Sequence, residues 1–293
     1  MEQETVHKNK IRLPAVNYKL LMLLPTIMLI FSTVYVIWLS LGPGLTLDID
    51  LKGGTQITGD VSTSPDTAAM ESALKSFGAN VRSARGVTGW TVIIELPVEA
   101  NSDEVMKVLA AAGWNLSNYS VQTIGPALGA SFFQQAQIAL LIAFIAMSIT
   151  IFIIFRVPMP SIYVILCGAS DLITALAASQ LLGIKLSLAT FSALLMLVGY
   201  SVDTDVLLTS RVLKSAEGDI NTKIRGAMRT GLTMTGTAIA ALAALYIISS
   251  SSVIIHIASV LLLGLLADIP YTWITNAGLL RWYVERKAKK AII

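Results

Sequence analysis

The sequence predicts an α-helical membrane protein with six transmembrane helices and an extracytoplasmic α+β domain of ferredoxin-like (βαββαβ) topology between the first two. Of its 293 residues, 55% are hydrophobic and only 13% are charged, whereas soluble domains carry about 25% charged residues. Apolar runs long enough to cross a bilayer recur along the chain. One stretch, 42–131, instead has the composition of a water-soluble domain.

Several function classes are excluded by what the sequence lacks. Its single cysteine, Cys167, lies in an apolar run, so neither a disulfide framework within the chain nor a cysteine-based metal site can form. No P-loop, HExxH, GxGxxG or nucleic-acid-binding signature occurs. We therefore expect no enzyme activity, no cofactor, no metal and no nucleic-acid partner.

The first span is predicted at 20–41, after a polar, basic segment at 1–19. Its apolar run is longer than the roughly 7 to 15 residues of a cleavable signal, and Gly42-Pro43-Gly44 follows without a small-residue cleavage site. The run is therefore expected to be an uncleaved span with the N-terminus in the cytoplasm.

The segment 42–131 is predicted to be the extracytoplasmic domain. Apolar and polar residues alternate over 45–51, which indicates a strand, and Gly53-Gly54 then predicts a bulge or sharp bend. The further elements are a helix from 65 to about 77, strands at 80–85 and 91–96, a helix from 101 to near 113, and a strand at 119–124. This order is that of the split ferredoxin-like fold.

Five more spans follow as a bundle over 132–280. They are predicted at 133–155, 162–182, 186–214, 231–248 and 253–277. Lys and Arg gather in the loops on one side and in the basic tail 281–293, with Lys185 the exception. By the positive-inside rule, both termini are expected in the cytoplasm of a multi-pass plasma-membrane protein.

Two aspartates, Asp203 and Asp205, lie well inside the fourth span. A carboxylate in hydrocarbon costs about 2.5 to 3.5 kcal/mol even on the lenient insertion scale, so such groups indicate function. Residues two apart on a helix point about 200° from each other. Gly199 shares a face with Asp203, and Ser201 shares the other with Asp205. One face is expected to meet neighbouring helices and the other a second protein; which is which stays open.

Other spans carry candidate partners. Asp171 lies midway along the third span, and Asp268 lies two residues before Pro270, which is expected to kink the last span. Static packing by Asp171 and an interfacial position for Asp268 remain open alternatives. Arg229 opens the fifth span and is the expected partner of Asp203 or Asp205.

Several motifs together resemble a known family, the SecF members of the SecD–SecF protein-export membrane proteins, within the wider resistance-nodulation-division (RND) superfamily. The motifs are Gly53-Gly54-Thr55 after the first span, Gly125-Pro126 entering the second, Gly199-Tyr200-Ser201-Val202-Asp203-Thr204-Asp205 in the fourth, and Arg229-Thr230 opening the fifth. Where the common bacterial pattern has Asn-Asp-Thr, this chain has Asp203-Thr204-Asp205, which is similar to archaeal versions.

The resemblance implies a subunit that pairs with a SecD-like subunit beside the Sec translocon channel, surrounded by membrane lipid. It would use a cation gradient, carried by protons or sodium, to move the outer domain and so help unfolded exported proteins leave the channel. Our hypothesis makes Asp203 the main protonatable group and Arg229 its partner. Asp205 and Asp171 would line the path, with Asp268 as a further ion-coupling candidate.

Three alternative functions have to be compared with protein export. A half-size RND-type exporter of lipids or small molecules and a non-coupling structural subunit of a translocase both remain open. An intramembrane protease is disfavoured, because Ser201 lies near the inner end of its span and His256 near the outer end. Helix rise then separates these two side chains by tens of ångströms.

Overall fold

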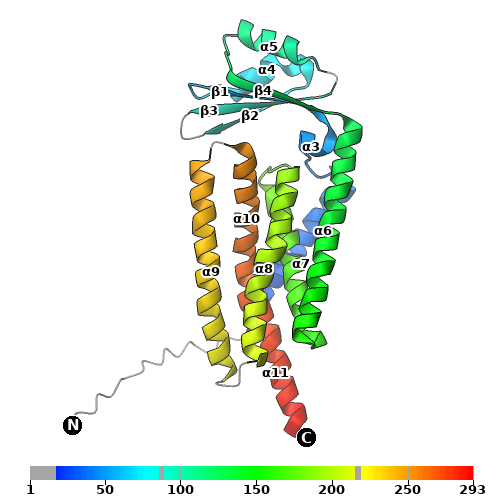
Figure 1. Cartoon of the computed structure of the whole chain (residues 1–293), viewed down its shortest axis with the longest axis vertical. Helices are drawn as coiled ribbons and strands as arrows, with labels where there is room; N and C mark the ends of the chain where they lie inside the picture. The colour runs from blue at the N-terminus through cyan, green and yellow to red at the C-terminus, as the bar shows by residue number, and fades with distance from the viewer. Residues whose placement is uncertain (1–17, 86–88, 99, 215–218, 250, 293) are drawn as a thin grey trace, which may run out of the picture.

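The computed structural model describes residues 18–85, 89–98, 100–214, 219–249 and 251–292. In these ranges six helices are long and apolar enough to cross a membrane, which confirms the predicted number. They are α2 (Leu23–Leu41), α6 (Pro126–Phe155), α7 (Pro158–Leu181), α8 (Leu188–Lys214), α9 (Ile220–Ile248) and the helical stretch Ser252–Lys287. Figure 1 shows an upright helix bundle with a small sheet domain at one end.

The sheet domain has the predicted βαββαβ order. Its elements are β1 (Gly54–Val61), α4 (Thr67–Ala73), β2 (Asn80–Arg85), β3 (Trp90–Leu96), α5 (Ser102–Ala111) and β4 (Ser117–Ile124), with a short 3₁₀ turn at Lys75–Phe77. The strand order is β2-β3-β1-β4 with every neighbouring pair antiparallel. Helices α4 and α5 cover the sheet face that points away from the bundle (Figure 1), as expected for two interleaved βαβ units.

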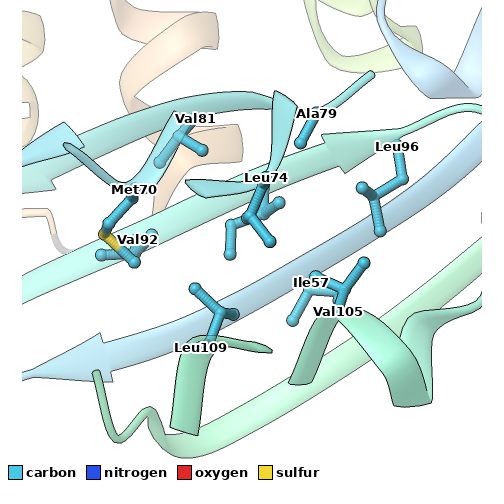
Figure 2. Packing of buried hydrophobic residues seen from close by; sticks show 10 residues of the cluster. Ile57, Met70, Leu74, Ala79, Val81, Val92, Leu96, Val105 and Leu109 are labelled. Atoms are coloured by element: carbon cyan, nitrogen blue, oxygen red, sulfur yellow. The ribbon is translucent and has the colours of Figure 1, made fainter. Parts of the chain in front are cut away.

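The core of the sheet domain lies between the sheet and these two helices. Ile57 and Val92 point from the strands toward Met70 and Leu74 of the first helical segment and Leu109 of α5 (Figure 2). Because alternate strand residues reach this core, the other sheet face is left to meet the bundle.

The predicted strand at 45–51 is wrong. Only Leu47 forms an isolated bridge, with Leu186 of the α7–α8 loop, and α3 (Ile49–Lys52) follows it. The Asp48 side chain caps α3 by accepting from the Ile49 N–H at 2.8 Å. A cap of this kind stabilises a helix start, so the local hydrogen bond outweighs the alternating pattern, and Ile49 becomes buried against the rest of the structure.

Three spans begin several residues earlier than predicted. Helix α6 begins at Pro126 rather than 133, because Pro is well suited to the first helical position. Helix α7 begins at Pro158 rather than 162, and α9 at Ile220 rather than 231.

The last span is not a simple kinked helix. Helix α10 (Ser252–Pro270) passes into a π-helical segment, Tyr271–Asn276, and then into α11 (Ala277–Ile292). Pro270 removes one backbone hydrogen bond, and the wider π-helical turn directly after it takes up the change. This segment carries polar side chains into the bundle.

Helices α7 and α8 form the centre of the bundle. In the most apolar 18-residue stretch of each helix, the buried share is 56% in α7 and 50% in α8, but 11% in α6 and in α9. Glycine allows close contact with the last span: a Cβ on Gly264 of α10 would collide with Leu197 of α8. The inward faces of α7, α8 and α10 therefore define the interior in which a buried site can exist.

Candidate functional site

A cluster of carboxyl groups lies in the interior of the bundle. Asp171 of α7, Asp205 of α8 and Asp268 of α10 are each 0% exposed. Burial of this kind is rare for aspartate unless the group is paired or functional. The three aspartates, with the hydroxyl and amide groups that bind them, are called the core cluster below.

Thr272 connects two of the aspartates. Its Oγ1 lies 3.0 Å from Asp205 Oδ1 and 2.8 Å from Asp268 Oδ1. A threonine hydroxyl has one proton to donate and can also accept. Thr272 can donate its one proton fully to only one carboxylate or share it between the two; a proton on either carboxyl group would make both contacts full hydrogen bonds. The geometry therefore suits a pair that holds a proton.

The remaining polar groups complete the core cluster. Asn276 donates from Nδ2 to Asp205 Oδ1 at 2.7 Å, and Ser201 donates to Asp171. Thr204 Oγ1 lies 3.1 Å and 3.3 Å from the two carboxyl oxygens of Asp268. Donors of this kind stabilise a carboxylate without supplying positive charge.

Charge compensation within the core cluster is incomplete. Asp171 Oδ1, Asp205 Oδ2 and Asn276 Oδ1 are buried without a hydrogen-bond partner. Within the described residues no lysine, arginine or histidine forms an ion pair with any of the three aspartates. An unpaired charge in a low-dielectric interior is very costly. The buried carboxyl groups of the core cluster therefore have no positively charged side chain beside them in the described part of the chain.

Asp203 lies outside this cluster. It is exposed on the outward face of α8, together with Gly199, whereas Asp205 faces inward. The 200° separation predicted from the sequence is thus realised, and the structure settles that Asp205 is the inward residue. Asp203 does not join the core cluster of this chain, and its role as the main protonatable group stays a prediction.

The predicted ion pair of Arg229 is also absent. Arg229 is exposed on α9, and among the described residues it forms no ion pair with Asp203 or Asp205. The physical reason is orientation, because its position on α9 points away from the bundle interior. Arg211 of α8 instead reaches α9, donating to Thr230 Oγ1 at 3.2 Å.

Comparison with known proteins identifies the family. Residues 104–286 match the family model described as "Protein export membrane protein SecD/SecF, C-terminal". The chain belongs to the SecD/SecF family of protein-export membrane proteins. It is 41% identical to the protein-export membrane protein SecF of Methanothermobacter thermautotrophicus, covering 92% of this chain and 93% of the relative.

Other archaeal SecF proteins are similarly related. The SecF of Methanocaldococcus jannaschii is 38% identical over 94% of this chain and 99% of the relative. The SecF of Pyrococcus furiosus is 38% identical over 99% of both. These are the names of export proteins rather than enzymes, as the sequence predicted.

A solved structure shows the same fold. The crystal structure of SecDF, a translocon-associated membrane protein from Thermus thermophilus, matches with a TM-score of 0.75 at 18% identity. The match covers 92% of this chain but only 38% of SecDF. The predicted fold class, six membrane helices with a small α+β domain, is therefore confirmed for this SecD/SecF family member.

Two of the family-like motifs meet in space. A Cβ on Gly53 would lie 2.7 Å from Pro126 Cα, and one on Gly129 would lie 2.7 Å from the Gly53 nitrogen. Thr55 bonds Thr123 through their hydroxyls at 3.0 Å. The Gly53-Gly54-Thr55 and Gly125-Pro126 motifs therefore form one packed corner where the sheet domain joins α6.

Two residues of the core cluster, Thr204 and Asn276, are not among the site residues that the sequence predicts. A signal for Asn276 existed, because Asp268, Thr272 and Asn276 are spaced by four and share one helix face. Near the cluster, the Thr174 hydroxyl of α7 lies 2.9 Å from that of Tyr271.

A second charged site joins the sheet domain to the bundle. Glu95 of β3 is 3% exposed and accepts from Lys185 Nζ at 2.6 Å, with Lys52 Nζ at 3.6 Å and Arg82 also paired to it. Burial alone would raise the pKa of Glu95. The Lys185 hydrogen bond and the charges of Arg82, Lys185 and Lys52 outweigh burial and hold that pKa below its ordinary value.

Proposed function

We propose that this chain is a SecF-type subunit that pairs with a SecD-like subunit beside the Sec translocon. There it couples the movement of a cation, most simply a proton, to movement of the sheet domain and so assists the release of unfolded exported proteins. The names of its relatives support the export role. The length of SecDF, of which this chain spans 38%, supports pairing with a second bundle.

The main support for pairing with a SecD-like subunit is the outward position of Asp203 and Arg229. Asp203 lies eleven residues from the end of α8 at Lys214, and Arg229 nine residues from the start of α9 at Ile220. At 1.5 Å per residue both lie about 15 Å from those ends. Asp203 lies among apolar residues of α8, where a charge is costly against lipid, so a partner subunit covering it would account for its position. Arg229 follows the polar first turns of α9 and would lie nearer the membrane surface, within reach of the same partner.

The core cluster supplies the switching element of this proposal. Its carboxyl groups come from α7, α8 and α10, so adding or removing a charge changes the interactions among three helices. One elementary charge crossing the membrane potential carries about 2.3 kcal/mol per 100 mV. That free energy is enough to shift the populations of two bundle arrangements by about fiftyfold.

The sheet domain is the proposed moving part. Glu95 and Lys185 give the bundle a direct ionic contact with it, and the packed corner at Gly53 gives a second connection. We propose that 42–131 is the extracytoplasmic domain, that 132–280 is the transmembrane bundle after the span at 20–41, and that 1–19 and 281–293 face the cytoplasm.

Export rates and subunit capture test this function. Asp203→Asn and Arg229→Ala are each expected to slow export of a secretory protein at least tenfold in cells or vesicles that hold a gradient. Thr233→Ala, an exposed neighbour on α9, serves as the control and should export normally. Normal export by both charge variants would refute the role of Asp203 and Arg229 in pairing with the SecD-like subunit. Co-purification of the SecD-like subunit distinguishes lost assembly from lost coupling.

A further inference from the structure

An open cavity of about 470 Å³ lies at the end of the bundle away from the sheet domain. Its walls come from the corner between α6 and α7, from the end of α8 and from α11. Figure 1 shows α11 at that end of the bundle. Apolar side chains line most of it, including Phe155, Val212 and Val284. None of these residues belongs to the core cluster.

Two lysines line the same cavity from different helices. Lys214 is the last residue of α8, and Lys287 lies in α11. Lys214 Nζ donates to the Ile154 carbonyl oxygen at 3.3 Å and lies 5.7 Å from the centre of the Phe155 ring. No acidic residue lines the cavity among the described residues. The charged side chains that line the cavity are therefore both basic, Tyr283 adds a neutral hydroxyl group, and the remaining lining is apolar.

The surface beside the cavity shows the same separation of basic and apolar groups. Ile154, whose carbonyl holds Lys214, is exposed, and so is Ile153 beside it on α6. An apolar surface facing lipid thus begins directly next to the ammonium group. A soluble anion would use only the lysines, and an apolar peptide only the walls. An amphiphile with an anionic head and hydrocarbon tails would use both.

We propose that this cavity binds one anionic phospholipid, with its phosphate between Lys214 and Lys287 and a hydrocarbon chain along the exposed end of α6. Basic pockets between transmembrane helices near a membrane surface are a recognised way of holding such headgroups. The bound lipid would link the end of α8 to α11, two elements that meet at this cavity.

Native mass spectrometry of the purified full chain in detergent tests the proposal. The chain is titrated in parallel with phosphatidylglycerol, with phosphatidylcholine and with glycerol phosphate. We expect phosphatidylglycerol to bind at least tenfold more tightly than either of the others. Equal affinity for the two lipids would overturn the charge assignment. Equal affinity for glycerol phosphate and phosphatidylglycerol would overturn the lipid assignment.

Substitutions locate the site. Lys214→Gln and Lys287→Gln should each weaken phosphatidylglycerol binding about fivefold, whereas Lys287→Arg should preserve it. Arg225→Gln, which removes the same charge from an exposed α9 position that does not line the cavity, should bind as the unaltered chain does. Unchanged binding in the Lys214→Gln/Lys287→Gln double variant, or an equal loss in Arg225→Gln, would place the lipid elsewhere and refute the proposal.

Discussion

Lys185 Nζ lies 2.6 Å from Glu95 Oε2, and this contact joins the loop between α7 and α8 to the central part of the sheet. Lys185 is the one basic residue in the loops of the five-span bundle that are predicted to lie on the outer side of the membrane. The structure explains this exception, because Lys185 neutralises a buried carboxylate of the sheet domain.

Removing the Glu95 charge should weaken the junction between domain and bundle. Glu95→Gln leaves three cations around a neutral amide, and we expect a loss of about 2 kcal/mol in the free energy of unfolding, since breaking buried pairs costs about 3–5 kcal/mol and these cations are partly exposed. Thermal unfolding of the purified chain measures it. Glu104→Gln, on the exposed face of α5, is the matched control, and an equal loss there would contradict the assignment.

The stability of the sheet domain should depend on pH through the same residue. The pKa of Glu95 is lowered below its ordinary value of 4.5, so its stabilising contribution is fully present above pH 4.5 and is lost as pH falls through the lowered pKa. Burial, followed by the charge of Asp48, raises the pKa of Asp50 and gives an effect of opposite sign.

Denaturant unfolding followed at a series of pH values below neutrality checks this dependence. The unaltered chain should lose stability in the acid range, and Glu95→Gln should show a flatter curve there. Parallel curves for the two proteins would show that Glu95 is not the group responsible.

Replacing each of two glycines of α9 with alanine should have different effects on the stability of the chain. A Cβ on Gly231 would collide with the Trp273 ring, whereas one on Gly236 would meet nothing within 4 Å. Gly231→Ala is therefore expected to destabilise the chain by about 1–3 kcal/mol. Gly236→Ala should leave stability unchanged or raise it by up to about 1 kcal/mol, because alanine favours helix. Melting temperatures of the two variants, compared in the chain without a partner, decide the matter; similar losses would argue against this packing.

Removing a charge from the core cluster should affect export much more than it affects the stability of the chain. Asp205→Asn keeps the shape and an acceptor for Asn276 and Thr272 but cannot ionise. We expect stability within about 1 kcal/mol of the unaltered chain, with gradient-driven export reduced at least tenfold. The control is Thr209→Val, at a buried position one turn away on α8. It should change neither the stability of the chain nor export. Full export by Asp205→Asn would remove the cluster from the coupling path.

Much of the site was visible in the sequence because a membrane makes charge conspicuous. Asp171, Asp205 and Asp268 stood out as carboxyl groups within apolar runs, and no knowledge of their neighbours was needed. Their convergence was not visible, since it depends on the rotation of three helices about their own axes. The mispredicted strand at 45–51 shows the same limit, because capping by Asp48 overrode the pattern.

The sequence by itself determined the number of spans, the βαββαβ order of the sheet domain and the opposite directions of Asp203 and Asp205. These follow from hydropathy and from the fixed periodicities of helix and strand, which are local properties. Only the tertiary structure decided that Asp205 faces inward while Asp203 and Arg229 face outward, and that Lys185 pairs with Glu95. Those outcomes depend on how helices and sheet pack, and packing is a property of surfaces that lie far apart along the chain.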